Sequence, residues 1–368
     1  MKKLLLFISI YDCTKTVILL LSELKFKAFV QSVFIYLNAN VIILFDNRGL
    51  FMIFAKTKCV IPSCDGVHKL NGVGYIPIGT VKAAMLIIHG LCEHTELYTE
   101  FMSFLAEKGI AVFVYDQLGH GHTAKDLEEL GSFAEENGDE LLIKDAHNFA
   151  EKYMGDYTGV PHYLFGHSFG SFIARICAAR YPDIADGIIL AGTSGTQYAA
   201  VMGAAITDVK SRIQTGLHRS ESSQRLFYDI FNMEFRSEGR NYSWLSSDLN
   251  EVELHEQDKL FCFTFTIKAM NDIVHLCLKC TDKSWYENID KHCRVLILSG
   301  QNDPLGDFGK GVLEVKKRLD ECGAQDVSLK IYSGARHEIL HDKCKKDVCD
   351  DVLSWIVSYD NGKYSERH

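Results

Sequence analysis

The chain of 368 residues is predicted to adopt an α/β fold, with a mostly parallel sheet, helices on both faces and an inserted helical cap. Apolar strand-like runs alternate with amphipathic segments at 97–108, 139–153 and 345–359, an order typical of such sheets. The alternation stops once, at residues 193–290, where helical patches carry apolar side chains without a strand rhythm. A hydrophobic content of 47% is ample for one large core.

These patterns divide the chain into four parts. Residues 1–51 form an apolar N-terminal extension, and residues 52–192 and 291–368 form the two parts of the α/β core. We expect residues 193–290 to form a cap over the carboxyl ends of the strands, where open α/β sheets bind ligands. A second, independent domain is the alternative for this stretch.

The N-terminal extension has three competing explanations. Residues 28–45 are eighteen residues without a charge, fourteen of them apolar, at the lower bound for a membrane span. Lys2 and Lys3 precede an apolar run as in a signal peptide, but no small-residue cleavage site follows. The extension is therefore a membrane anchor, an apolar segment packed on the core, or upstream sequence included by a wrong start site, with Met52 as the true initiator.

The first core strands are expected early in residues 52–192. Residues 59–61 and 70–76 have strand composition, and 63–66 provide the turn between them. Residues 83–88 and 110–115 are the next apolar strands, and both run into loops that contain histidine and glycine. Such loops at strand ends commonly border a functional site.

Two histidines in the loop after residue 88 are candidate metal ligands. His89 and His94 lie close in sequence, but nothing nearby completes a ligand set. We therefore expect both side chains to orient their loop through hydrogen bonds.

The segment Gly166-His167-Ser168-Phe169-Gly170 matches a nucleophile elbow, in which a serine sits on a sharp turn between a strand and a helix. An apolar run at 161–165 precedes it, and an alanine-rich, helix-like stretch at 172–179 follows. Glycines flank the serine because a Cβ there would collide with the neighbouring element. Ser168 is therefore the candidate nucleophile, and we expect His167 to pack beside it without taking part in the chemistry.

A serine nucleophile needs a histidine base and a carboxylate that holds the imidazole tautomer. A buried strand at 294–300 is followed by Asp303, and a strand at 327–332 is followed by His337. The order serine, acid, histidine with each partner after a strand is typical of this architecture. Asp303 is the predicted acid and His337 the predicted base, with Asp307 as the alternative acid.

Acyl transfer also requires two N–H donors for the developing oxyanion. The residue after the nucleophile, Phe169, supplies one of them. Leu91, in the loop after the strand at 83–88, is the natural source of the second.

With these residues identified, the chain resembles the monoacylglycerol lipase and lysophospholipase branch of the α/β-hydrolases, also called serine aminopeptidase-like hydrolases. The resemblance covers about residues 52–360 and implies an α/β-hydrolase fold, with Ser168, Asp303 and His337 as catalytic residues and Leu91 and Phe169 as oxyanion hole. Its motifs are His89-Gly90-x-x-Glu93-His94, Asp116-x-x-Gly119-His120-Gly121, Gly166-His167-Ser168-x-Gly170, Asp303-Pro304 and Gly334-Ala335-x-His337-Glu338. Ser171 departs from a glycine that often follows the elbow.

Charge and cysteine spacing limit the cofactors and partners that we expect. A net charge of −9 without a basic run excludes nucleic acid as a partner. The twelve cysteines lack framework spacing, so we expect free thiols and a cytoplasmic protein. A zinc site at Cys277 and Cys280, with His275, His292 and Cys293 nearby, lacks two regular ligand pairs, and we expect neither metal nor cofactor. Contact with a membrane surface would involve the cap or the N-terminal segment.

The predicted function is that of a serine hydrolase that cleaves a carboxylic ester of a single-chain lipid, such as a monoacylglycerol or lysophospholipid, through an acyl-enzyme. The apolar cap favours an acyl chain, because each buried methylene contributes about 0.8 kcal/mol. An aminopeptidase or an acyltransferase with the same triad is an alternative, although a peptidase needs an acidic clamp for the substrate amine. A catalytically silent binding protein on the same fold is a further alternative.

Overall fold

The computed structural model describes residues 41–42, 45–46, 49–50, 54–196, 218–219, 221–261 and 263–359. Most of the predicted anchor at residues 28–45 lies outside these ranges, as do Met52 and the apolar pair Val201 and Met202 of the predicted cap. Among the described helices, none has both the length and the apolar character that crossing a membrane requires.

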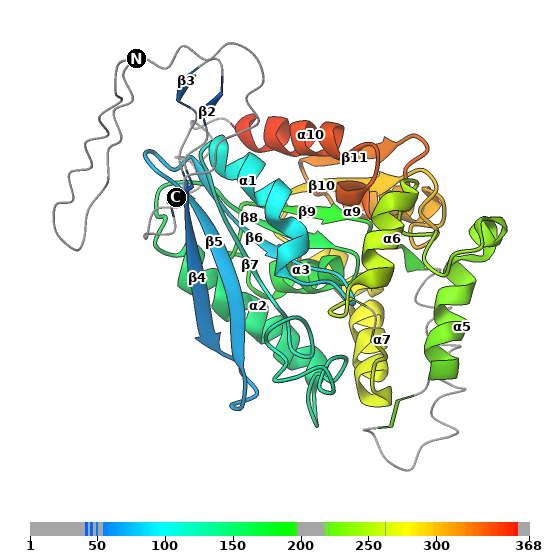
Figure 1. Ribbon diagram of the computed structural model, residues 1–368. Helices are drawn as coiled ribbons and strands as arrows, with labels where there is room; N and C mark the ends of the chain where they lie inside the picture. Colours follow the sequence, from blue (N-terminus) through cyan, green and yellow to red (C-terminus); the bar gives the residue numbers. More distant parts are fainter. Residues whose placement is uncertain are drawn as a thin grey trace, which may run out of the picture.

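A large sheet with the strand order β1-β4-β5-β7-β6-β8-β9-β10-β11 forms the centre of the molecule (Figure 1). The strands from β7 to β11 in this order are mutually parallel, and β4 and β5 join them as an antiparallel edge. The strands are β1 (Val41–Ile42), β4 (Phe54–Pro62), β5 (Lys69–Pro77), β6 (Ala83–Ile88), β7 (Ile110–Tyr115), β8 (His162–His167), β9 (Gly187–Ala191), β10 (Arg294–Gly300) and β11 (Val327–Tyr332). A separate hairpin pairs β2 (Phe45–Asp46) with β3 (Gly49–Leu50).

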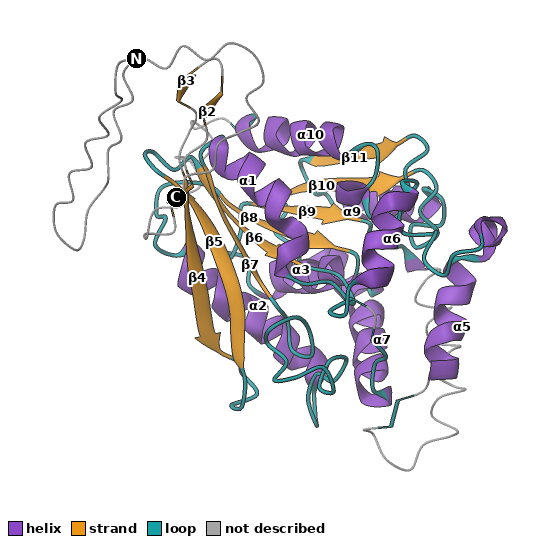
Figure 2. Cartoon of the chain, viewed as in Figure 1, coloured by secondary structure: helices purple, strands orange, loops and turns teal. Residues whose placement is uncertain are grey.

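Helices cover both faces of the sheet, as Figure 2 shows. On one face α1 (Thr99–Glu107) and α10 (Lys345–Val357) share an apolar cluster with the strands. On the other face α2 (Gly138–Met154), α3 (Phe169–Arg180) and α9 (Lys310–Glu321) share a second cluster. The predicted fold class, a mostly parallel α/β sheet covered on both faces, is thereby confirmed.

The segment between β9 and β10, which we call the insertion, is helical where the structure describes it. Its elements are α5 (Glu221–Phe231), η2 (Met233–Glu238), α6 (Leu249–Gln257), α7 (Ile267–Thr281) and α8 (Lys283–Asn288). Two further short 3₁₀ helices lie in the core, η1 (Thr95–Tyr98) and η3 (Ile339–His341).

Part of the insertion belongs to the core layer. The apolar side chains of α7 and α8 lie in the same cluster as those of α2 and α3. Arg175 of α3 is fully buried, donates to the carbonyl oxygen of Cys280 at 2.6 Å and lies over the ring of Trp285. Trp285 falls within residues 193–290, the predicted cap over the strand ends. It lies behind α3 because the buried guanidinium requires carbonyl and aromatic partners.

The N-terminal extension contributes one described strand to the sheet, since Val41 and Ile42 of β1 pair with Ala55 and Phe54. The predicted core, which begins at residue 52, leaves this short strand out. Strands β4 to β11 and both apolar clusters of the described residues lie within 54–359, so β1 adds only a short antiparallel edge.

Deletion of residues 1–51 is therefore expected to leave a soluble enzyme with unchanged kcat and a thermal midpoint lowered by a few degrees at most, because about 1 kcal/mol shifts the midpoint by a few degrees in a domain of this size. The measurements are kcat, the thermal midpoint and fractionation of the full-length and truncated chains. Aggregation of the truncated chain would instead make the extension an integral part of the core. Release from membranes on truncation would make it an anchor.

Candidate active site

Ser168 lies between the end of β8 and the start of α3, with φ 51° and ψ −121°. A side chain rarely adopts this conformation, and here the surrounding packing enforces it. A Cβ added to Gly170 would lie 2.0 Å from the carbonyl oxygen of Ile88 at the end of β6, and one added to Gly166 would lie 2.5 Å from the carbonyl oxygen of Gly170. Both glycines of the predicted elbow are therefore required by close backbone approach.

The structure brings Ser168, His337 and Asp303 together from three separate loops. The Nε2 atom of His337 lies 2.8 Å from Ser168 Oγ, and its Nδ1 atom lies 3.0 Å from Asp303 Oδ1. Since a carboxylate only accepts, Nδ1 donates to Asp303, and Nε2 then carries the lone pair that faces the serine hydroxyl. This is the hydrogen-bond order that a serine nucleophile needs.

Asp303, not Asp307, is the carboxylate that contacts the histidine. Asp303 is fully buried, and its Oδ1 atom also accepts from the backbone N–H of Leu305 at 2.9 Å. Asp307 is half-buried in a turn in which its own N–H donates to the carbonyl oxygen of Pro304. The geometry thus supports the first of the two acids that the sequence offered.

The two predicted oxyanion donors also border Ser168. Phe169 is the first residue of α3, where backbone N–H groups have no partner within the helix. The loop after β6 reaches the nucleophile closely, since a Cβ on Gly90 would lie 3.0 Å from the Cβ of Ser168. Leu91, the next residue, lines the same cavity as Ser168.

A buried ion pair lies behind the nucleophile. The Nδ1 atom of His167 lies 2.5 Å from Oε1 of Glu93, whose Oε2 atom accepts from the N–H of Gly90 and from the hydroxyl of Tyr98. Burial alone would lower the pKa of His167, but the charge and hydrogen bond of Glu93 raise it to about 9. Burial likewise opposes the charge of Glu93, yet His167 holds the pKa of this carboxyl below its usual range. Both groups are therefore charged at neutral pH.

The other histidines of the two strand-end loops hold those loops in place. His89 contacts the carbonyl oxygen of Gly90 at 2.8 Å, and its other ring nitrogen accepts from the N–H of Gln117. His94 contacts Asp258 of the insertion at 2.8 Å. Burial lowers the pKa of His120 to about 3, so this ring is neutral among the aromatic side chains around it.

A small cavity opens beside Ser168 and His337, with about 30 Å³ of space for the centres of water molecules. Its lining is mostly apolar, and six of its thirteen residues belong to the insertion. The insertion residues that line it are Tyr228, Phe231, Tyr242, Trp244, Leu245 and Phe261. The indole of Trp244 packs against the imidazole of His337, with ring centroids 4.8 Å apart.

Two groups of described side chains have the composition of a metal site. One group is His255, Glu338 and His341, and the other is Asp139, Asp272 and His275. Neither contains Cys277 or Cys280, which are buried thiols on α7.

Sequence reasoning named Glu93 and Glu338 only as parts of motifs and missed their partners in the folded chain. Glu93 pairs with His167, and Glu338 contacts His255 of the insertion. The available signal was the position of each carboxylate next to a histidine of a strand-end loop, since Glu93 precedes His94 and Glu338 follows His337. Trp244 and His255 stand in no motif, and only their position in the fold connects them to the site.

Comparisons with known proteins identify a family, similar sequences and similar structures. The profile of the family described as "Serine aminopeptidase, S33" matches residues 79–344. The monoglyceride lipase of Mus musculus is 27% identical over 319 residues, which cover 82% of this chain and 93% of the relative. The monoglyceride lipase of Saccharomyces cerevisiae is 26% identical over 297 residues, which cover 75% of this chain and 85% of the relative.

Among solved structures, the chain is similar to a highly thermostable carboxyl esterase from Bacillus coagulans in complex with glycerol. The TM-score is 0.75 at 27% sequence identity, and the match covers 83% of this chain and 98% of the esterase.

The pair formed by His167 and Glu93 predicts a pH dependence of stability. A raised histidine pKa stabilises the fold fully below the unfolded value of about 6.5, and this contribution is lost as the pH rises through about 9. Between these limits the thermal midpoint of the wild type should fall more steeply with pH than that of Glu93→Gln. His167→Asn should show the same flatter slope. Parallel curves for the wild type and both variants would contradict the ion pair.

Proposed function

Because the chain belongs to the serine aminopeptidase S33 family, we propose that it is a carboxylic ester hydrolase acting on single-chain lipids such as monoacylglycerols or lysophospholipids. The observation that carries the proposal is the imidazole of His337, which lies 2.8 Å from Ser168 Oγ and 3.0 Å from Asp303 Oδ1 beside a mostly apolar cavity.

In the first half of the reaction, Ser168 Oγ attacks the ester carbonyl while its proton moves to Nε2 of His337. The buried carboxylate of Asp303 stabilises the imidazolium that forms. The N–H groups of Leu91 and Phe169 bind the negative oxygen of the tetrahedral intermediate. When the intermediate collapses, His337 gives its proton to the departing alkoxide and the acyl group stays on Ser168.

In the second half, a water molecule takes the place of the alcohol. His337 accepts its proton as the water attacks the acyl-enzyme, and the fatty acid leaves when Ser168 recovers a proton from the imidazolium.

The lining of the cavity supports an acyl chain as the bound group. Insertion side chains such as Phe231, Trp244 and Leu245 offer aromatic and aliphatic contacts next to the nucleophile. Each methylene of a chain buried there contributes about 0.8 kcal/mol. We infer that the insertion acts as the cap over the acyl chain.

The charges near the cavity support an ester over a peptide substrate. A free N-terminal amine needs an unengaged carboxylate close to the nucleophile. The cavity-lining carboxylates of Glu93 and Glu338 already pair with histidines of the protein. An aminopeptidase is therefore the weaker candidate, although it shares the triad.

A cytoplasmic enzyme that draws its substrate from a membrane surface fits these features. Cys59, Cys177, Cys277 and Cys280 are buried thiols outside any disulfide, in keeping with a reducing compartment. Met233, Leu249 and Leu254 are exposed apolar side chains of the insertion, and they would provide contact with lipid.

Asp303→Asn is expected to lower kcat about ten-thousand-fold, because the amide allows the wrong tautomer of His337. Asp307→Asn is the matched control, and its rate should stay close to that of the wild type because Asp307 does not contact the imidazole. The measurement is hydrolysis of a p-nitrophenyl ester by the two purified variants. A larger loss in the Asp307 variant would reassign the acid.

A panel of p-nitrophenyl esters from acetate to laurate tests the substrate class. Each added methylene should improve kcat/KM up to about fourfold until the cavity is full. Monoacylglycerols, lysophospholipids and aminoacyl amides complete the panel, and Ser168→Ala serves as the inactive control. A profile that peaks at acetate, or faster cleavage of the amides than of any lipid ester, would refute the lipid assignment.

A further inference from the structure

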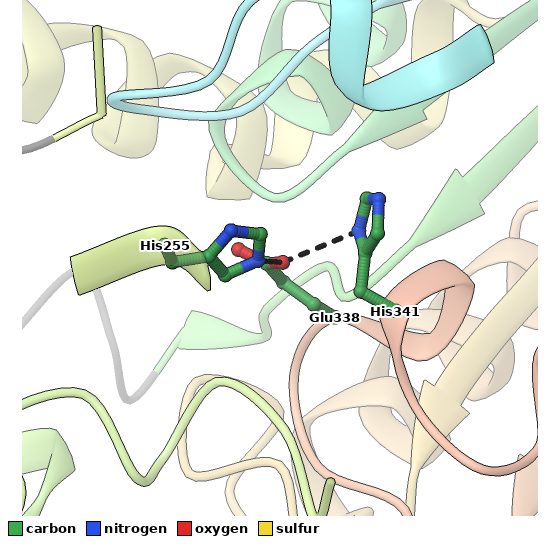
Figure 3. Close-up of side chains that lie close together, drawn as sticks. All are labelled: His255, Glu338 and His341. Atoms are coloured by element: carbon green, nitrogen blue, oxygen red, sulfur yellow. Dashed lines mark hydrogen bonds and ion pairs between the residues drawn. The ribbon is translucent and has the colours of Figure 1, made fainter. Parts of the chain in front are cut away.

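Glu338, the residue after His337, connects the catalytic loop to the insertion. Its Oε2 atom is in direct hydrogen-bond contact with Nε2 of His255, at the end of α6, and lies 3.3 Å from Nδ1 of His341 (Figure 3). Glu338 and His255 are only 3% and 2% exposed. Two imidazoles therefore contact one oxygen of Glu338, that of His255 from the insertion and that of His341 from the core.

Opposite charges strengthen the contact between His255 and Glu338. Burial opposes the charge of His255, but the carboxylate of Glu338 raises the pKa of this imidazole. The pKa of Glu338 is held well below its usual range, against the effect of burial, by His255 and His341. A buried charge that loses its partner is strongly unfavourable, so α6 stays attached to the catalytic loop.

The same end of α6 is also held by the loop after β6. Asp258 follows the helix directly, and its carboxylate lies 2.8 Å from Nε2 of His94. Both loops that border the nucleophile therefore contact one helix end of the insertion.

The wall of the cavity lies between α6 and the catalytic histidine. The N–H of Glu338 donates to the carbonyl oxygen of Leu245 at 2.7 Å, and the N–H of His337 donates to that of Trp244 at 3.4 Å. Leu245 and Trp244 both line the cavity beside Ser168. Ser246 and Ser247 of the same segment also donate to His341 and Asp342. These bonds hold the wall against the loop, and the contact between His255 and Glu338 holds the helix that follows it.

We propose that His255 is a positioning residue for the substrate: through its contact with Glu338 it holds the wall formed by Trp244 and Leu245 against the catalytic loop. The inference rests on the proposed function, because it assigns this wall to the acyl chain. A substrate then meets a preformed apolar surface, and little ordering of the wall opposes binding.

A divalent metal is the alternative occupant of this cluster. The ligand atoms of His255, Glu338 and His341 lie within 4.8 Å of one another, and zinc accepts such donors. The direct contact between His255 and Glu338 leaves no room for an ion between them. The ring of His341 donates through Nε2 to the carbonyl oxygen of Leu97, so its Nδ1 atom faces the carboxylate. A proton between Glu338 and His255 accounts for their direct contact without an ion, and the metal content of the purified protein distinguishes the two.

The test compares His255→Leu, which removes the contact, with His255→Gln, whose amide N–H can still donate to Glu338. The readouts are kcat and KM for p-nitrophenyl acetate and decanoate. His255→Leu should raise KM for decanoate about tenfold more than KM for acetate, because two wall side chains must then be ordered on binding. His255→Gln should restore most of the wild-type KM. His147→Gln, which alters a histidine paired with Glu151 on the distant helix α2, is the matched control.

Equal losses on both esters, or a KM for decanoate unchanged by His255→Leu, would overturn the proposal while leaving the proposed function intact. A wild type that cleaves neither ester would refute the proposed function itself. If His255→Leu does not fold, the double variant His255→Leu/Glu338→Leu removes both partners of the contact and leaves no unpaired carboxylate at position 338. Its KM values for acetate and decanoate are then compared in the same way. If the purified wild type contains one equivalent of zinc and His255→Gln contains none, the cluster is a metal site and the proposal is wrong.

Discussion

The candidate site depends on the close approach of three backbone segments around Ser168. The end of β6, the end of β8 and the start of α3 are packed so tightly that Gly170 has no space for a Cβ against the carbonyl oxygen of Ile88. This packing holds Ser168 at a positive φ, which lifts its hydroxyl out of the sheet. It also brings Leu91, after β6, to the same point. Backbone packing thus places the nucleophile and both proposed oxyanion donors before any side-chain contact is made.

Buried imidazole–carboxylate pairs then fix the loops relative to one another. Glu93 joins the loop after β6 to His167 on the elbow strand, and Glu338 joins the loop after β11 to His255 of the insertion. Buried ion pairs are poor sources of net stability, because desolvation offsets much of their attraction. Their positioning effect is what matters here, since each carboxylate joins its own loop to an imidazole of another element, β8 for Glu93 and α6 for Glu338.

The sequence predicted the central strands well and the insertion poorly. The runs at 83–88, 110–115, 294–300 and 327–332 coincide with β6, β7, β10 and β11. Strands buried on both faces, such as β6 and β10, read as continuous apolar runs, so their bounds follow from composition. The edge strand β11 is less buried and alternates apolar with polar residues. Ser168, Asp303 and His337 were accessible to prediction because each follows one of the strands that the sequence indicates. In contrast, the sequence of the apolar insertion helices does not reveal which part of the core they pack against. The position of Trp285 next to α3 therefore follows only from the tertiary structure.

That packing divides the insertion into two parts with different freedom to vary. Arg175 is fully buried and depends on the carbonyl oxygen of Cys280 and on the ring of Trp285, so α7 and α8 cannot leave α3 without stranding a guanidinium in the core. Residues 228–248 supply most of the insertion side chains that line the cavity, whereas the buried pair of His255 and Glu338 ties α6 to the core. We therefore expect changes in substrate size to fall on wall residues such as Tyr228 and Phe231, because α6, α7 and α8 are each held by a buried charged group.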